Sequence, residues 1–176
     1  MSAAGSRWDG VSLAVLCGGA EDGAPSVDSA WLGTLFEDLL WVGLDAEPPF
    51  PGRRVADPPG AACPLRGLVG ALEAAREERV LLLAGRHGAP LPDVVFALLA
   101  APDADAIVPL TDGGAEPLCA LYRREPVLAR ARARLTGGSL DLQALLDDLD
   151  VWPLEGAALL SLRSAGRGSE EETACA

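Results

Sequence analysis

The chain has 176 residues, of which 49% are hydrophobic and only 5% aromatic, and its formal net charge is −12 at pH 7. This length suits one domain with an aliphatic core, and the acidic surface disfavours nucleic acid, whose phosphates it would repel. All 14 basic residues are arginines, so Schiff-base chemistry on lysine and the phosphate lysine of a P-loop are both excluded.

The chain opens with a predicted buried strand. The apolar run from Val11 to Cys17 ends at Gly18 and Gly19, which is typical of a strand that enters a tight turn. Apolar side chains then recur on one helical face from Ser26 to Leu39. We therefore expect a helix there, followed by a second strand over residues 41–44.

The middle of the chain predicts a long loop, and then a helix before and after a buried strand. The proline-rich stretch 46–59 should be extended, with a short strand at 54–57. Pro64 suits the first turn of a strongly amphipathic helix. A buried strand over 80–84 and a helix that begins at Pro92 follow.

The last third of the chain continues this alternation and ends in a polar tail. Residues 1–163 are therefore expected to form one domain, and residues 164–176, rich in Gly, Ser and Glu, a disordered tail. The expected elements are strands at 106–109, 118–122 and 151–154, a further candidate strand at 157–162, a helix from Pro126 and a helix from Ser139 to Leu146.

The alternation of strands and helices indicates a Rossmann-like, three-layer α/β domain with a mostly parallel sheet. Its most apolar strands, Val11 to Leu16 and Val80 to Leu83, should be adjacent and central. Ligands of such sheets bind at the carboxyl ends of the strands. The loops at 18–19, 57–64 and 85–90 follow predicted strands and therefore form the candidate site.

Three segments carry a family resemblance. They are Leu16-Cys17-Gly18-Gly19, then Asp57 with the later Cys63-Pro64-Leu65-Arg66-Gly67, and finally Glu116 to Tyr122. In this order they resemble the LAGG loop, the Asp with its GPLAG element, and the HPLCALY-like strand of the molybdenum cofactor guanylyltransferases. The resemblance covers residues 11–155 and implies a nucleotide-diphospho-sugar transferase-like fold.

The resemblance also implies a function and a set of site residues. The family transfers GMP from GTP to molybdopterin and releases pyrophosphate, with Mg²⁺ as cofactor. A guanine nucleotide would be bound at the turn after the first strand. The nucleotide-binding residues implied by matching positions are Leu16, Cys17, Gly18, Gly19 and Asp57.

The chain departs from the family where the phosphates and the metal are held. Glu21 and Asp22 follow the glycine turn in place of the family's Ser, Arg and Lys, and acidic groups there would repel phosphate. Arg86 stands at the position of the family's metal-binding Asp, and an arginine cannot bind magnesium. No metal ligand is therefore assigned, and we expect guanylyltransferase activity to be weak or lost.

Ordinary structural roles remain open for each candidate. The Gly18-Gly19 turn also suits a plain strand-to-helix connection, Asp57 a capping carboxylate, and Cys17 simple packing. Arg86 with His87 is either a solvated loop tip or a metal-free anion clamp that binds nucleotide. Two function classes follow: a divergent guanylyltransferase that binds guanine nucleotide or molybdopterin, or a pseudoenzyme that binds a partner protein or the molybdenum cofactor.

The remaining composition limits the chemistry and the location. His87 is the only histidine, so a Ser-His-Asp mechanism would have to use it. The four cysteines are too widely spaced for a zinc ribbon or a disulfide framework, and reduced thiols are expected. No apolar run has the length of a membrane helix, and Leu16 is too bulky to precede the cysteine of a lipoprotein signal. We therefore expect a cytoplasmic protein without a membrane partner.

Overall fold

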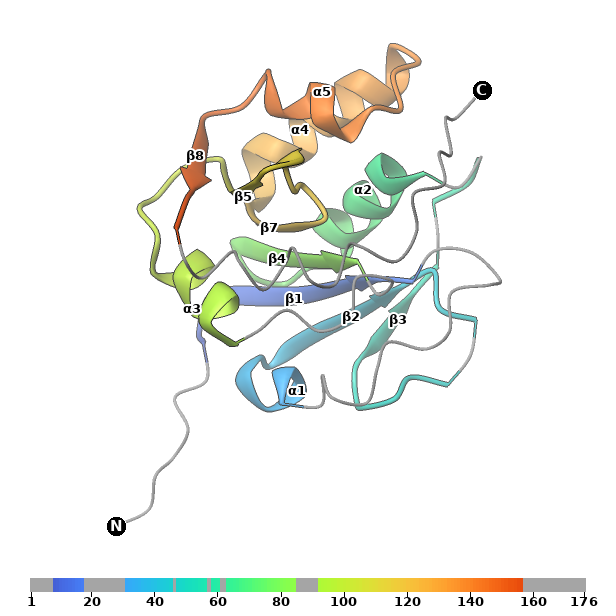
Figure 1. Ribbon diagram of the computed structural model, residues 1–176. Coiled ribbons are helices and arrows are strands. Elements are labelled where there is room, and N and C mark those ends of the chain that lie inside the picture. Colours follow the sequence, from blue (N-terminus) through green and yellow to red (C-terminus); the bar gives the residue numbers. More distant parts are fainter. Residues whose placement is uncertain are drawn as a thin grey trace.

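A computed structural model describes residues 8–17, 31–45, 47–56, 58–60, 63–84 and 92–156. Strands and helices alternate through most of these residues (Figure 1). The helices are α1 (Leu32–Leu35), α2 (Pro64–Ala74), α3 (Pro92–Ala100), α4 (Arg124–Thr136) and α5 (Leu142–Leu146). The strands are β1 (Val11–Leu16), β2 (Asp38–Val42), β3 (Arg53–Val55), β4 (Arg79–Ala84), β5 (Ala106–Thr111), β6 (Gly114–Ala115), β7 (Cys119–Arg123) and β8 (Val151–Leu154).

The strands form one sheet in the order β3-β2-β1-β4-β7-β5-β6, and β8 pairs with β5. β1 lies between β2 and β4 and runs parallel to both, so the predicted adjacency of the two most apolar strands is confirmed. β7 lies between β4 and β5 and is antiparallel to both. Because β3 and β8 also pair in parallel with their neighbours, the sheet is mostly parallel, as the sequence predicts.

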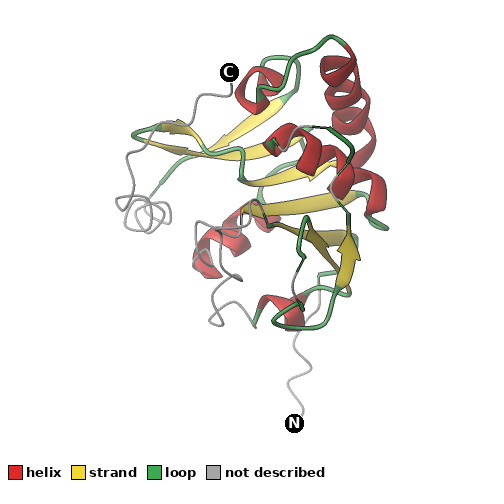
Figure 2. Ribbon diagram, turned by 90° about the vertical axis from the view of Figure 1, so that its right-hand side faces the viewer, coloured by secondary structure: helices red, strands yellow, loops and turns green. Residues whose placement is uncertain are grey.

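Helices cover both faces of this sheet, which gives the expected three layers (Figure 2). Successive residues of a strand point to opposite faces. In β1, Ala14 joins the buried cluster formed with α2, α4 and α5, and Leu13 joins the cluster formed with α1 and α3. None of the helices in the described ranges combines the length and the apolar composition that a membrane span requires.

Helix α2 lies on one face of the sheet and buries a continuous apolar stripe. Pro64 occupies its first turn, and Leu65, Leu68 and Leu72 are completely buried. These leucines recur at helical spacing, so they point to the sheet together. The helix predicted from this pattern is therefore confirmed.

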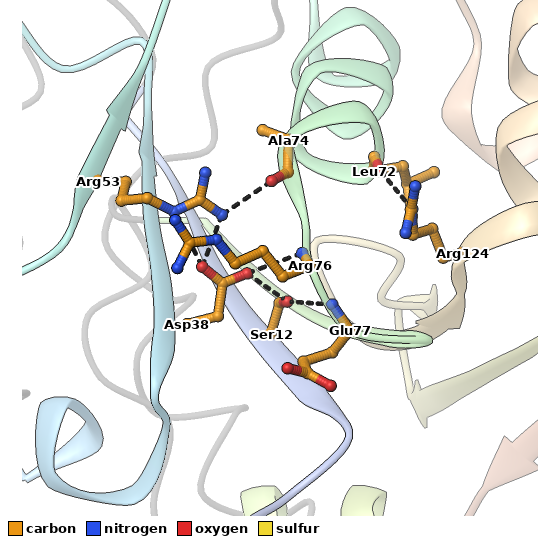
Figure 3. A network of polar contacts seen from close by, with 8 residues as sticks. All are labelled: Ser12, Asp38, Arg53, Leu72, Ala74, Arg76, Glu77 and Arg124. Carbon is orange, nitrogen blue, oxygen red and sulfur yellow. Dashed lines mark hydrogen bonds and ion pairs between the residues drawn. The ribbon is translucent and has the colours of Figure 1, made fainter.

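The carboxyl end of α2 is capped by arginines from other elements. Nη2 of Arg53 donates to the Ala74 carbonyl at 2.8 Å, and Nε of Arg124 donates to the Leu72 carbonyl at 3.2 Å (Figure 3). The last turn of α2 has no basic residue of its own. The two arginines therefore satisfy carbonyls that the helix leaves unpaired and place positive charge at its negative end.

Asp38 connects this cap to the sheet through a buried carboxylate. Its side chain is only 4% exposed and accepts a hydrogen bond from Ser12 Oγ at 2.6 Å and from the Arg76 amide at 2.9 Å. Nε and Nη2 of Arg53 donate to the same carboxylate at 3.0 and 2.6 Å. The Glu77 amide in turn donates to Ser12 Oγ at 3.2 Å. The network thus joins the amino ends of three parallel strands to the α2–β4 connection (Figure 3).

The Asp38 carboxyl group is held in its charged form. Burial alone would raise its pKa, but the hydrogen bonds from Ser12, the Arg76 amide and Arg53, together with the Arg53 charge, outweigh burial. The pKa therefore lies below its ordinary value of 3.8. A buried carboxylate with several donors favours ionisation in this way.

The structure corrects the predicted boundary between the first helix and the second strand. The helix expected as far as Leu39 ends at Leu35, and β2 begins at Asp38 rather than at residue 41. Leu39 packs on one face of the sheet and Leu40 on the other. This period of two identifies a strand buried on both faces, whereas the isolated position of Leu39 also fitted a helical stripe.

Two further boundaries differ from the sequence-based expectation. Asp141 rather than Ser139 caps α5, since its carboxylate accepts a hydrogen bond from the Gln143 amide at 2.8 Å. Helix α4 begins at Arg124, two residues before the expected Pro126. Proline is tolerated in the first turn of a helix, so it did not mark the start.

Removal of the Asp38 carboxylate should strongly destabilise the protein. In Asp38→Ala, Arg53 and the Ser12 hydroxyl lose their shared buried acceptor, and we expect a loss of about 3 kcal/mol in the free energy of unfolding. Urea unfolding measures this loss. Glu73→Gln, which breaks the exposed ion pair with Arg132, is the control and should cost less than about 1 kcal/mol. Equal costs in the two variants would contradict the assigned role of Asp38.

The stability due to Asp38 should depend on pH with a defined sign. Because the folded-state pKa is lowered, this stability is complete above the unfolded-state pKa and is lost as pH falls through the folded-state pKa. The difference in unfolding free energy between wild type and Asp38→Asn should therefore be largest near neutral pH and shrink below about pH 4. Denaturant unfolding at a series of pH values measures it. A difference that stays constant into strong acid would count against the charged carboxylate.

Candidate functional site

The candidate site lies where the parallel strands β1 to β4 reach their carboxyl ends. Backbone hydrogen bonds continue the pairing just beyond the strands. The Cys17 amide donates to the Val42 carbonyl at 2.8 Å, and the Gly43 amide donates to the Val55 carbonyl at 3.0 Å. The chain segments that leave β1, β2 and β3 are therefore held side by side at one edge of the sheet.

Of the predicted nucleotide-binding residues, Leu16 and Cys17 are described at this edge. Leu16 ends β1, and Cys17 follows it with a half-buried side chain. Both side chains pack against the core clusters. This is compatible with the packing role left open for Cys17, and a contact of either residue with nucleotide stays a prediction. The other candidates lie outside the described residues: Gly18, Gly19, Asp57, Arg86 and His87.

Described parts of the three segments that resemble the guanylyltransferases lie at this edge. Helix α2 approaches the end of β1 closely, since a Cβ atom on Gly67 would lie 3.1 Å from Cδ2 of Leu16. The third segment leads into β7, and the Leu118 carbonyl accepts a hydrogen bond from the Ala84 amide at the end of β4, at 2.9 Å. Segments far apart in the sequence therefore reach the same edge of the sheet, as expected for a shared site.

The segment Pro58 to Gly60, which follows β3, packs along one face of α2. A Cβ on Gly70 would lie 3.1 Å from the Pro58 ring, so the glycine allows this close approach. Four residues earlier on the helix, Nη1 of Arg66 donates to the Pro59 carbonyl at 2.6 Å. Residues four apart lie on the same helical face. Arg66 and Gly70 thus hold the segment against the beginning of α2.

Arg66 is a site residue that the sequence reasoning missed. Its guanidinium lies against the backbone of Gly60, where a Cβ would come within 2.6 Å of Cζ. Nε of Arg66 is buried and has no hydrogen-bond partner among the described residues. A cation in the first turn of a helix without an acidic residue was the available signal, because the helix dipole disfavours it there.

At the end of β5, a tight hairpin forms the far side of the same sheet edge. Oγ1 of Thr111 accepts a hydrogen bond from the Gly113 amide at 3.2 Å and donates to the Gly114 carbonyl at 3.1 Å. Nε2 of Gln143 donates to the Ala115 carbonyl at 3.0 Å. Helix α5 thereby holds this hairpin in place.

The described residues of the site do not form a metal centre. Within the ranges that the structure covers, no three His, Cys, Asp or Glu side chains are grouped so that they could hold an ion. No catalytic step through Mg²⁺ is therefore assigned to these residues. Cys119 is also unsuited to nucleophilic chemistry, because burial, with the nearby Glu116 charge, raises the pKa of its thiol to about 12.

Comparison with known proteins identifies the fold. No family model matches the sequence, and no match to a curated protein is significant. A protein of Aquifex aeolicus VF5 gives a TM-score of 0.69 at 18% sequence identity, over 93% of this chain and 94% of that one. The 2-C-methyl-D-erythritol 4-phosphate cytidylyltransferase of Thermus thermophilus gives 0.63 at 17% identity, over 88% and 98% of the two chains.

A third structure bears a name related to the resemblance seen in the sequence. The molybdopterin-guanine dinucleotide biosynthesis protein A of Archaeoglobus fulgidus gives a TM-score of 0.60 at 18% identity, over 81% of this chain and 82% of that one. At such low identity the similarity establishes the fold alone. The chain has a nucleotidyltransferase-like α/β fold, which confirms the predicted fold class.

Substitution of Gly60 should disturb the Arg66 contact. Gly60 has φ +123°, so Gly60→Ala adds backbone strain of about 1–3 kcal/mol as well as a clash with the guanidinium. Gly114→Ala is the matched control, since Gly114 has φ +107° and no atom within 4 Å of its added Cβ. We expect Gly60→Ala to cost about 1 kcal/mol more than the control in thermal or urea unfolding.

A double-mutant cycle isolates the contact between these two residues. In an Arg66→Ala background, the excess cost of Gly60→Ala over Gly114→Ala should disappear, because no guanidinium is left to displace. An excess that persists without Arg66 would show that the strain at Gly60 has another source.

Proposed function

We propose that this chain binds a guanine nucleotide at the carboxyl edge of its sheet, as a divergent relative of the molybdenum cofactor guanylyltransferases. The observation that carries the proposal is that described parts of the three resembling segments reach that edge: Gly67 lies close to Leu16, and Leu118 bonds to Ala84 at the end of β4. Open α/β sheets bind ligands at this position. The similar solved structures include proteins named for guanine dinucleotide synthesis and for cytidylyl transfer.

The same proposal includes weak or lost transfer activity. Transfer of a nucleotidyl group needs positive charge around the phosphates while pyrophosphate leaves. The chain has no lysine, and it places Glu21 and Asp22 after the glycine turn and Arg86 at the family's metal position. Binding of the nucleotide therefore relies on arginine and backbone donors. These donors can hold the phosphates, but they support transfer of the nucleotidyl group less well.

A pseudoenzyme is the second candidate, and the loss of both lysine and the metal carboxylate from the sequence favours it. Such a protein would keep the fold and the binding edge and bind the intact molybdenum cofactor or a partner protein. Retained affinity without turnover is the expected behaviour. The two candidates share the site and differ in whether a covalent step follows binding.

Guanylyltransferase assays should find little activity in the wild-type protein. With GTP, molybdopterin and Mg²⁺, we expect pyrophosphate release far below about one turnover per second, because the phosphates lack lysine and a metal carboxylate. GTP binding should be measurable by calorimetry and persist in EDTA. Turnover near one per second, or binding that strictly requires Mg²⁺, would contradict weak transfer. Failure to bind any guanine nucleotide would instead favour the pseudoenzyme, which the intact cofactor then tests.

A further inference from the structure

Arg66 occupies a position in α2 that the helix itself does not favour. It lies in the first turn of α2, whose N-cap residue Cys63 makes no side-chain cap hydrogen bond and whose first turn has no acid. The amino end of a helix carries partial positive charge, so a cation there is repelled by the helix dipole. An anion near the guanidinium would remove this repulsion.

The hydrogen bonding of Arg66 leaves its Nε without a partner among the described residues. Nη1 donates to the Pro59 carbonyl at 2.6 Å, while Nε is buried without a partner among the described residues. A buried donor without an acceptor is costly in a native protein and calls for an explanation such as an ion or ligand. The Pro59 carbonyl and the Gly60 backbone fix the guanidinium plane, so its remaining Nη donors are held in place for an incoming acceptor.

Several other arginines in the described ranges have carboxylate partners. Ion pairs join Arg53 to Asp38, Arg123 to Asp103, Arg124 to Glu125, Arg132 to Glu73 and Arg134 to Asp148. No ion pair involves Arg66 within the residues that the structure describes. Among the described residues, Arg66 thus has a buried Nε without a partner, no carboxylate partner, and a place at the edge where the strands end.

The two other buried donors without partners have different surroundings. Nε1 of Trp41 lies in the core, where the indole meets the ring of Phe50 at a centroid distance of 4.6 Å. Nε of Arg123 lies at the amino edge of the parallel strands, on a side chain already paired with Asp103. Neither borders the candidate site, whereas the partly exposed guanidinium of Arg66 does.

We propose that Arg66 binds a phosphate group of the ligand, as the cation of this site. Guanidinium presents paired donors that match the geometry of phosphate oxygens, and the amino end of α2 adds to the attraction. The inference rests on the proposed function for the site, but it requires only a phosphate-bearing ligand and no particular base. It gives the site a positive charge in a chain that has no lysine.

Calorimetric titration with inorganic pyrophosphate and with GTP tests the inference. Relative to wild type, Arg66→Gln should weaken the binding of pyrophosphate by about tenfold to a hundredfold, which is the usual effect of losing a charge-assisted hydrogen bond. Arg66→Lys keeps the charge but loses the planar fork of donors. Its affinity for pyrophosphate should therefore lie between those of wild type and Arg66→Gln. Arg130→Gln removes one positive charge from an exposed position on α4 and should change affinity less than about twofold.

Salt dependence separates contact with phosphate from a merely structural role. If Arg66 contacts the phosphate, Arg66→Gln should flatten the dependence of affinity on salt, because one charge–charge attraction is gone. If Arg66 only holds Pro58 to Gly60 in place, affinity would fall with an unchanged salt slope, and the inference would be wrong. Circular dichroism and thermal unfolding confirm that each variant is folded before titration.

The two ligands keep this inference distinct from the proposed function. Arg66-dependent binding of pyrophosphate without binding of GTP would support Arg66 as the phosphate cation and overturn the guanine nucleotide proposal. GTP binding that is equal in wild type and Arg66→Gln would leave the proposed function standing and overturn the inference. Absence of binding to both ligands in wild type would overturn both.

Discussion

The buried carboxylate of Asp38 is the interaction on which the arrangement of this fold depends. It accepts hydrogen bonds from β1, β3 and the α2–β4 connection, so three elements that are distant in sequence share one acceptor. Arg53 continues the network to the Ala74 carbonyl. Since a buried charge is tolerated only when it is paired and hydrogen-bonded, these elements must adopt one relative position to satisfy it.

This constraint gives the two edges of the parallel strands different properties. At the amino edge, Arg53 and Arg124 donate to carbonyls at the carboxyl end of α2, and the Asp38 carboxylate holds Arg53 in place. At the carboxyl edge, the amino end of the same helix faces the strand ends, and Gly67 and Gly70 let the backbone approach closely. Fixing one end of α2 therefore determines where its positive end is presented. Stability and ligand binding can thus reside at opposite ends of one helix.

Much of the fold follows from apolar periodicity. The runs in β1 and β4 are buried on both faces, so their central, adjacent and parallel placement could be predicted. The network around Asp38 could not, because it joins residues 26 and 38 positions apart. Two signals were present in retrospect: Ser12 is a polar residue within an otherwise apolar strand, and Asp38 is the polar first residue of a second apolar strand.

The candidate site, too, could be predicted from the sequence only in part. The order of the resembling segments predicted which strand ends meet, since parallel strands bring their carboxyl ends to one edge. The environment of Arg66 depends instead on the Pro59 carbonyl and on a positive φ at Gly60, which no sequence pattern specified.

The proposed role of Arg66 also relates to the charge balance of the site. In the resembling family a carboxylate, a divalent ion and a lysine together carry two positive charges, the same number that Arg66 and Arg86 would supply together. On this proposal the chain keeps the attraction for phosphate, and the backbone fixes the guanidinium group of Arg66 that provides it. A metal ion can follow charge onto a leaving pyrophosphate by exchanging its ligands, whereas an arginine fixed by the backbone cannot. The same charge would then favour binding over release.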